Sequence, residues 1–476
     1  MTQHPLFRTR GVMLDLGRIT EKRQYYEELL PWLAQWGYNL VHLHLVDDQR
    51  CGLRFPRRPE LATTGAFTAD EMRAFVSLAA GYGIAVMPEI ETLGHAARIT
   101  SHPKYRHLQE KSDHPWGFNA ICPAHPETRA LLSDLLADVA EIFPHPVIHV
   151  GLDEVHFGKC PRCSRHFGAR AEAWERFAAH AVWVHEAVRK LGRRPAMWAD
   201  HLVAEPRLLE PFPRDVLLFN WDYDAEYSSA KAARLLDAGY EVIACPALLR
   251  STSRVAPNPA NIANLRNATA RSLLQREHGK GVTGMVNTVW CPWRYLPGVI
   301  DYGLAFAAHL MTAREEDPGL AAHFAREFYG LRSGTRVGAA LAALYAAGIE
   351  ARTYERIVGG ESHKELFTRE EQRLCALLAA RMKDVIAALR AERPRVRCRK
   401  ERYDDVIVSA EALLAVAQFG AAGRRKGAVR NARAVYARAT KQWARDRWPN
   451  DSMRFGDPRF PQSNESLLRT LRRLSK

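Results

Sequence analysis

Short apolar runs alternate with helical patterns from about residue 10 to residue 313, which is typical of parallel strands joined by crossover helices. Between the first two runs, Tyr25, Leu29 and Leu33 are spaced for one face of a helix, and Gly37 is a stop signal. The eight expected strands cover residues 12–16, 40–46, 85–91, 147–151, 196–200, 216–221, 242–245 and 282–290. Eight strands in about 300 residues predict a (β/α)8 TIM barrel.

Polar or aromatic residues follow nearly every expected strand. Asp47 and Asp48 follow the second strand, and Asp153 and Glu154 follow the fourth. Barrel active sites lie at the C-terminal ends of the strands and on the loops after them. A doubly wound sheet would need only one or two such ends, so the pattern favours the barrel.

After residue 312 the pattern becomes helical, with almost no strand signal. We therefore expect a barrel over residues 1–315 and a basic α-helical C-terminal domain over residues 316–476. Residues 390–476 hold 22 Lys and Arg against 9 Asp and Glu, most of the net charge of +15. No nucleic-acid recognition motif accompanies them, so an acidic contact within the chain, or between subunits of a homo-oligomer, is the favoured reading.

The composition, with 47% apolar and 25% charged residues, is that of a folded globular protein. No uninterrupted apolar run approaches the roughly 18–20 residues that span a membrane, and the first residues lack the pattern of a secretory signal. The eight cysteines are spread over a chain long enough to build a core, which favours reduced thiols over a disulfide framework. The expected location is the cytoplasm.

Two adjacent carboxylates, Asp153 and Glu154, end the expected fourth strand. Two close negative charges in a half-buried site raise the pKa of at least one carboxyl group. A carboxylic acid that keeps its proton near neutral pH is a candidate proton donor for catalysis. The alternative is a solvated pair at the start of a loop or helix.

Four motifs on four consecutive strands form a series with a specific order and spacing. They are RGVMLD at residues 10–15, NLVHLHLVDDQ at 39–49, MPEIETLGH at 87–95 and HVGLDE at 149–154. Together they resemble the catalytic barrel of glycoside hydrolase family 20, the β-N-acetylhexosaminidases. The resemblance covers roughly residues 8–300 and does not include the helical C-terminal part.

The resemblance implies retaining hydrolysis in which the 2-acetamido oxygen of the substrate attacks the anomeric carbon, without an enzyme nucleophile. Glu154 would act as general acid and base, and Asp153 would hold the acetamide N–H. Asp47 and His95 would support the carboxylates, with the choice between Asp47 and Asp48 left open. Arg10 would bind sugar hydroxyls. The sugar face and the acetyl methyl group would be walled by Trp198, Trp221 and Trp290.

The sequence departs from the family at three places. Leu152 stands where a second glycine is usual. No tyrosine for the acetamide oxygen follows the seventh strand, and Tyr223 and Tyr295 are the alternatives. The usual Trp-x-Glu after the last strand is replaced by Trp290-Cys291-Pro292.

The expected activity is removal of terminal non-reducing β-linked GlcNAc or GalNAc from a small oligosaccharide or glycoside. A different or modified sugar, or sugar binding without turnover, are the alternatives.

A separate cluster directly follows the catalytic pair: His156, Cys160, Cys163 and His166. Two thiolates and two imidazoles suffice for a tetrahedral structural zinc ion. Against this, a full site usually draws its ligands from two separated segments, so two reduced loop cysteines are the alternative. The expected chemistry itself requires no cofactor.

Overall fold

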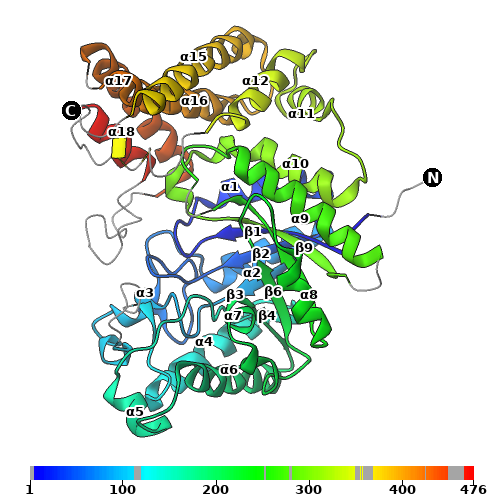
Figure 1. The fold of residues 1–476 in the computed structure, drawn as a ribbon, viewed down its shortest axis with the longest axis vertical. Helices are drawn as coiled ribbons and strands as arrows, with labels where there is room; N and C mark the ends of the chain where they lie inside the picture. The colour runs from blue at the N-terminus through cyan, green and yellow to red at the C-terminus, as the bar shows by residue number, and fades with distance from the viewer. Residues whose placement is uncertain are drawn as a thin grey trace. The chain divides into compact units, whose positions relative to one another are not determined.

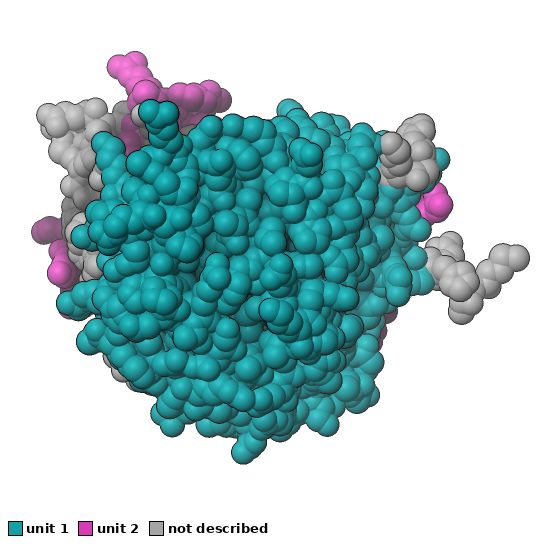
Figure 2. Space-filling view, turned by 90° about the horizontal axis from the view of Figure 1, so that it is seen from below, with its two compact units in different colours: residues 1–246, 267–288, 450–454 teal, residues 247–266, 289–449, 455–476 magenta. Residues whose placement is uncertain are grey.

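The structure is a computed structural model that describes residues 5–111, 119–250, 253–277, 281–348, 354, 356–357, 368–423, 425–448 and 466–476. The chain separates into two compact units (Figure 2). Unit 1 comprises Met1–Pro246, Asn267–Thr288 and Asn450–Arg454, and unit 2 comprises Ala247–Arg266, Val289–Pro449 and Phe455–Lys476. The division into domains of residues 1–315 and 316–476 stays a prediction.

Unit 1 contains a closed barrel of parallel strands (Figure 1). Each barrel strand pairs with the next, and β1 pairs with β9 to close the ring. The barrel strands are β1 (Thr9–Asp15), β2 (Leu40–His44), β3 (Ala85–Glu89), β4 (Val147–His149), β5 (Arg194–Trp198), β6 (Leu217–Trp221), β7 (Glu241–Cys245) and β9 (Gly284–Val289). The prediction of a (β/α)8 barrel is confirmed, and each of the eight expected strands is present.

Helices cover the outside of the strands, among them α4, α6 and α8 (Figure 1). In the first helix, Tyr25, Leu29 and Leu33 are buried, and Gly37 ends it in the left-handed conformation with φ 102°. The helices of the barrel connections are α1 (Arg23–Trp36), α2 (Ala69–Gly81), α3 (Ala97–Thr100), α4 (Pro126–Ile142), α5 (Pro161–Phe167), α6 (Ala173–Lys190), α7 (Asp200–Ala204), α8 (Ser229–Asp237) and α9 (Pro259–Glu277).

Unit 2 is mainly helical, as the sequence predicts for the C-terminal part. Its longest apolar helix, α16 (Lys400–Ala422), passes a length and composition test for crossing a membrane. In its most apolar stretch of 18 residues, 83% is buried, and the helix packs against α15 and α17. It therefore has the environment of a core helix. The other elements of this unit are β8 (Ala247–Leu249), α10 (Asp301–Thr312), α11 (Leu320–Tyr329), α12 (Thr335–Tyr345), α15 (Arg369–Glu392), α17 (Lys426–Asp446) and α18 (Leu467–Leu474).

Candidate active site

The loop after β4 has an unusual backbone that presents the two adjacent carboxylates. Gly151, Leu152 and Glu154 all have positive φ, at 67°, 76° and 47°. Left-handed conformations are unfavourable for residues with a Cβ, and they persist where surrounding contacts enforce them. The family that the motifs resemble usually has glycine at position 152. Glycine adopts this left-handed conformation without strain, whereas Leu152 does not.

Neighbouring loops hold this strained segment in place. Asp200 of α7 accepts a hydrogen bond from the backbone N–H of Glu154 at 3.1 Å, and His201 accepts one from Val155 N–H at 3.0 Å. On the other side, the loop after β3 approaches closely at Gly94. A Cβ on Gly94 would lie 2.4 Å from the carbonyl oxygen of Asp153, so only glycine fits there.

Asp153 and Glu154 differ in exposure although they are adjacent. Asp153 is buried, whereas the Glu154 side chain is 57% exposed and can meet a ligand from solvent. Burial raises the pKa of Asp153 to about 7, with further upward contributions from the charges of Asp200 and Glu154. A hydrogen bond from His95 lowers the pKa of Glu154. The expectation that one pKa of the pair rises is met, by Asp153.

His95 connects the carboxylate pair to a second acidic pair. Its Nε2 atom lies 3.2 Å from Oε2 of Glu154 and 3.7 Å from Oδ2 of Asp153. Its Nδ1 atom lies 3.1 Å from Oδ2 of Asp48 and 3.8 Å from Oδ1 of Asp47. Burial opposes protonation of this imidazole, but the surrounding charges of Asp153, Asp47 and Asp48 raise its pKa well above the ordinary value. The surrounding carboxylates therefore favour the protonated form of His95.

Asp47 and Asp48 are both buried, and both lie near His95, so the structure places the two candidates in the same acidic layer. Asp47 accepts from Arg18 and His44, each at 2.8 Å. Asp48 contacts His95 and accepts from the N–H of Ala97 at 3.1 Å. Despite burial, the nearby Arg18 charge contributes most to lowering the pKa of Asp47, to about 2.

Beneath this layer, a second polar group fills the barrel interior around Glu89. Its carboxylate lies 2.9 Å from His42, 2.8 Å from His44 and 3.2 Å from His149. These side chains are fully or almost fully buried. Burial would raise the pKa of Glu89, but the three imidazoles lower it well below its usual range. The group is a buried polar network beneath the carboxylates of the site.

A comparison with known protein families identifies the family of this chain. The profile described as glycosyl hydrolase family 20, catalytic domain, matches residues 7–284. The chain belongs to glycosyl hydrolase family 20. The match contains the four strand motifs and the residues of the site described above.

Curated relatives carry names of the same family, and solved structures share the fold. A β-hexosaminidase of Vibrio furnissii is 28% identical over 280 residues, covering 51% of this chain and 43% of that protein. A β-N-acetylhexosaminidase of Cellulomonas fimi is 27% identical, covering 51% of this chain and 48% of that protein. This chain thus spans less than half the length of these relatives. The family 20 β-N-acetylhexosaminidase of Streptomyces coelicolor shares the fold, with TM-score 0.52, 23% identity, and coverage of 67% and 68%.

Arg10, expected to bind sugar hydroxyls, lies at the wrong end of its strand. It is the second residue of β1, and its guanidinium donates to the carbonyl oxygens of Gly37 and Phe7 at 2.7 and 2.8 Å. Family 20 barrels, like other TIM barrels, carry their chemistry at the C-terminal ends of the strands. The structure therefore removes Arg10 from the site. Arg18, which follows the same strand, is the arginine beside the acidic layer.

The sequence could have indicated Arg18. It stands three residues after Asp15, the last residue of β1, and its guanidinium bonds that carboxylate at 3.2 Å. Arg10 opens the first strand motif, at residues 10–15, whereas Arg18 lies in the loop after it. Strand direction, which places residue 10 at the bottom and residue 18 at the top, is the signal that separates the two.

The three expected tryptophans have different environments. Trp198 is fully buried, and its indole N–H donates to Glu89 at 2.6 Å, so it contacts the buried polar network, and its role toward a sugar stays a prediction. Trp221 is partly exposed and stacks on Tyr223, with ring centroids 5.2 Å apart. Trp290 directly follows β9 and belongs to unit 2, so its role stays a prediction. Tyr223 is also one of the two tyrosines considered for the acetamide oxygen.

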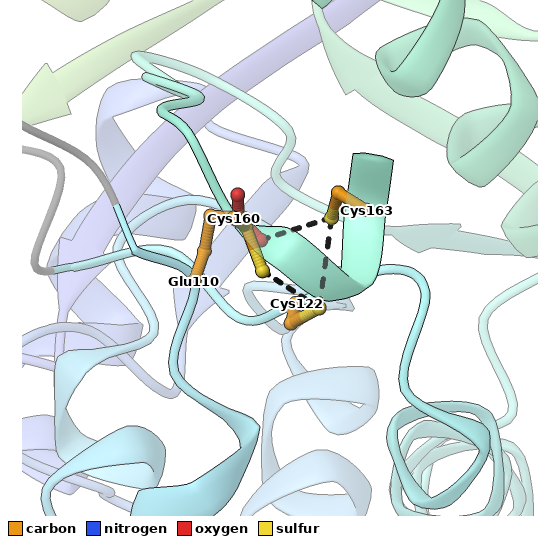
Figure 3. A group of neighbouring side chains, drawn as sticks. All are labelled: Glu110, Cys122, Cys160 and Cys163. Atoms are coloured by element: carbon orange, nitrogen blue, oxygen red, sulfur yellow. Dashed lines mark hydrogen bonds between the residues drawn. The ribbon is translucent and has the colours of Figure 1, made fainter. Parts of the chain in front are cut away.

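The expected zinc ligands are only partly brought together. Cys160 and Cys163 lie with Cys122 and Glu110, and their potential ligand atoms are all within 4.8 Å of one another (Figure 3). Neither His156 nor His166 belongs to this group. Cys160 precedes α5 and Cys163 is in its first turn, whereas His166 is near the end of that helix. Sequence adjacency suggested the histidines, and chain folding supplies a cysteine and a glutamate from the preceding loop.

Proposed function

We propose that this family 20 chain hydrolyses terminal non-reducing β-linked N-acetylhexosamine by substrate-assisted retention. The observation that carries the proposal is the arrangement of a buried Asp153 and an exposed Glu154 beside a shared His95. The names of the curated relatives, β-hexosaminidase and β-N-acetylhexosaminidase, support the same substrate class.

The proposed first step forms a bond from the acetamide oxygen to the anomeric carbon while the glycosidic C–O bond breaks. Glu154 gives its proton to the leaving oxygen. Asp153 accepts a hydrogen bond from the acetamide N–H and stabilises the positive charge of the oxazolinium intermediate. In the second step, Glu154 takes a proton from water while the water oxygen bonds to the anomeric carbon. The bond between the acetamide oxygen and the anomeric carbon breaks, which restores the acetamide group of the sugar.

In the free protein the environment favours the proton on the other carboxyl group, because burial raises the pKa of Asp153 and the hydrogen bond from His95 lowers that of Glu154. Substrate binding is expected to reverse this order. A sugar over Glu154 removes its exposed carboxylate from water and raises its pKa, while an acetamide N–H donated to Asp153 stabilises the ionised form there. Binding energy thereby places the proton where the reaction needs it.

A panel of aryl β-GlcNAc, β-GalNAc and β-glucoside substrates tests the proposal. Cleavage of at least one N-acetylated substrate, with the β-glucoside much slower, is expected because only the former carry the internal nucleophile. Equal rates on β-glucoside would contradict substrate assistance. Absence of turnover on every sugar would favour a sugar-binding protein.

Variants of the pair test the assigned roles. Glu154→Gln should lower turnover of a natural disaccharide by about 10²–10⁴-fold. On a nitrophenyl glycoside, whose leaving group needs little protonation, the loss should be much smaller. Asp153→Asn should slow both substrates by similar factors, because it acts on the internal nucleophile. The reverse pattern would exchange the two roles.

A second candidate is a hydrolase for a different or modified sugar. The segment after β7 supplies the buried residues Ala247, Leu248 and Leu249 where the family usually has a tyrosine, and Pro292 stands where the usual Trp-x-Glu ending has its glutamate. Both departures concern recognition of the sugar and not the acid pair. Cleavage of a substituted N-acetylhexosamine in preference to the parent glycoside would favour this candidate.

The cytoplasmic location belongs to the same proposal, with small glycosides as substrates. Free thiols at all eight cysteines are consistent with a reducing compartment. Fractionation of the source cells tests this, and finding most of the protein in the medium or periplasm would contradict it.

A further inference from the structure

Three cysteines and a glutamate meet at a buried point outside the carboxylate site, within unit 1 (Figure 3). Cys122 and Cys163 are 0% exposed, and Cys160 and Glu110 are 3% and 1% exposed. Ala124 and Phe167 pack against the cysteines. Such a site excludes water, so an ionised carboxylate and thiols there need partners of their own.

Two separate segments supply the four side chains. Glu110 and Cys122 come from the loop after β3, where Gln109 and Ile121 form an antiparallel bridge that places residues 110 and 122 on one face. The N–H of Glu110 donates to Ala120 and that of Cys122 to Leu108, which fixes the pair. Cys160 and Cys163 come from the loop after β4 and the first turn of α5. The four side chains therefore come from two separated segments, as is usual for a complete metal site.

The distances match coordination of one tetrahedral ion. Sγ of Cys122 lies 3.9 Å from Sγ of Cys160 and 3.6 Å from Sγ of Cys163. Two thiolates on one zinc ion, each bonded at about 2.3 Å, lie about 3.8 Å apart in tetrahedral geometry. A disulfide would require about 2.05 Å, and all three cysteines are free. The separations fit a shared metal ion and not a covalent bond.

The carboxylate of Glu110 completes the set. Its Oε2 atom lies 3.1 Å from Sγ of Cys163. Its buried Oε1 atom has no hydrogen-bond partner among the residues that the structure describes. A buried carboxylate aimed at three thiols is costly without a cation, whereas zinc accepts carboxylate oxygen together with sulfur ligands.

We propose that Cys122, Cys160, Cys163 and Glu110 bind one structural zinc ion. Four protein ligands fill the tetrahedral positions, so no position is left for substrate or a reactive water. The ion joins the loop after β3, which carries His95, to the loop after β4, which carries Asp153 and Glu154. Its function is to fix these two loops relative to each other. The proposal is independent of which sugar, if any, the site cleaves.

Metal analysis of this chain, expressed with added zinc and passed through a chelating column, tests the proposal first. About one tightly held zinc ion per chain is expected. Cobalt substituted for zinc should give a thiolate-to-cobalt charge-transfer band, which an oxygen and nitrogen site cannot produce. The proposal would be overturned if the protein bound neither zinc nor cobalt after refolding with a stoichiometric amount of either metal. Iron bound in place of zinc would also overturn it.

Matched variants locate the ion. Cys122→Ser should reduce bound zinc to a small fraction of the wild-type content and lower the melting temperature. Glu110→Gln should keep the charge-transfer band but release zinc to a competing chelator faster. Cys375→Ser alters another buried cysteine, in unit 2, and should keep the full zinc content.

A second control concerns a group nearer the surface, His107, His125 and Glu127, that could also hold a metal ion. His107→Ala should leave the zinc content unchanged. Loss of zinc in His107→Ala together with full content in Cys122→Ser would overturn the proposal. Alkylation of the denatured protein without reductant gives an independent check, because eight modified cysteines are expected and a disulfide among the three would contradict the site.

Discussion

His95 donates to Glu154 across two loops, with Nε2 of the imidazole 3.2 Å from Oε2 of the carboxylate. The same ring reaches Asp48 through Nδ1, at 3.1 Å. One imidazole therefore links the exposed acid to the buried acidic layer. Both residues of this contact have left-handed backbone, with φ of 44° at His95 and 47° at Glu154, which is unfavourable for residues with a Cβ.

Replacing His95 should mislocate Glu154 and change its titration. In His95→Gln, kcat/KM for a natural disaccharide is expected to fall by about 10²-fold, the size associated with a misplaced reacting group. The pKa of Glu154 should rise, because the hydrogen bond that lowers it is weakened. The acidic limb of the pH profile should therefore move to higher pH. His107→Gln, on an exposed histidine paired with Glu127, serves as the control and should leave both quantities unchanged.

The pH dependence of kcat/KM should report the carboxylate pair as a unit. The productive form carries one proton on the pair, so activity is expected to fall as pH rises through about 7, where Asp153 of the free protein loses its proton. It should fall again on the acidic side, where Glu154 also becomes protonated. Asp153→Asn should abolish the limb near 7 in the residual activity. Retention of that limb in the variant would assign it to another group.

Gly151 should not tolerate a side chain. A Cβ at this position would lie 1.9 Å from Oε2 of the buried Glu91. Gly151→Ala is expected to cost about 1–2 kcal/mol for the left-handed backbone and about 1–3 kcal/mol for overpacking. Gly192→Ala is the matched control, because Gly192 has φ 72° and open space around its Cβ position. Thermal unfolding of both variants measures the difference, and equal losses would show that the contact with Glu91 yields at no cost.

Replacing Arg18 and replacing Arg10 should have different effects on stability and activity. Arg18→Met leaves buried Asp47 without its strongest favourable charge and is expected to lower stability by about 3–5 kcal/mol and to reduce activity. Arg10→Met removes contacts at the opposite end of β1 and should leave kcat and KM near wild type. A large rise in KM for Arg10→Met, with Arg18→Met unaffected, would restore the first assignment.

The stability difference at Arg18 should depend on pH in a defined direction. The pKa of Asp47 is depressed to about 2 in the folded protein, so its contribution is present above the unfolded value of about 4. It is lost as pH falls through about 2. The gap in melting temperature between wild type and Arg18→Met should therefore be widest above pH 4 and narrow at lower pH. A gap that stays constant would mean that Arg18 acts through packing alone.

The sequence by itself determined the barrel and the acid pair. Eight apolar strand patterns, each ending in polar residues, predict which ends of the strands meet, because all strands of a parallel barrel point the same way. Asp153 and Glu154 follow directly from that rule and from the motif series. Local chemistry sufficed here because the signals lie within single strands and their adjoining loops.

Only the tertiary structure decided which side chains face the site and which lie behind it. Trp198 belongs to a strand end that the pattern favours, yet it points into the barrel toward Glu89. Arg10 and Arg18 flank one strand, and the direction of the chain places them at opposite ends. Cys122 and Glu110 join Cys160 and Cys163 through contacts that span about 40 to 50 positions of sequence. Such contacts depend on how loops pack against one another, and no local periodicity encodes that packing.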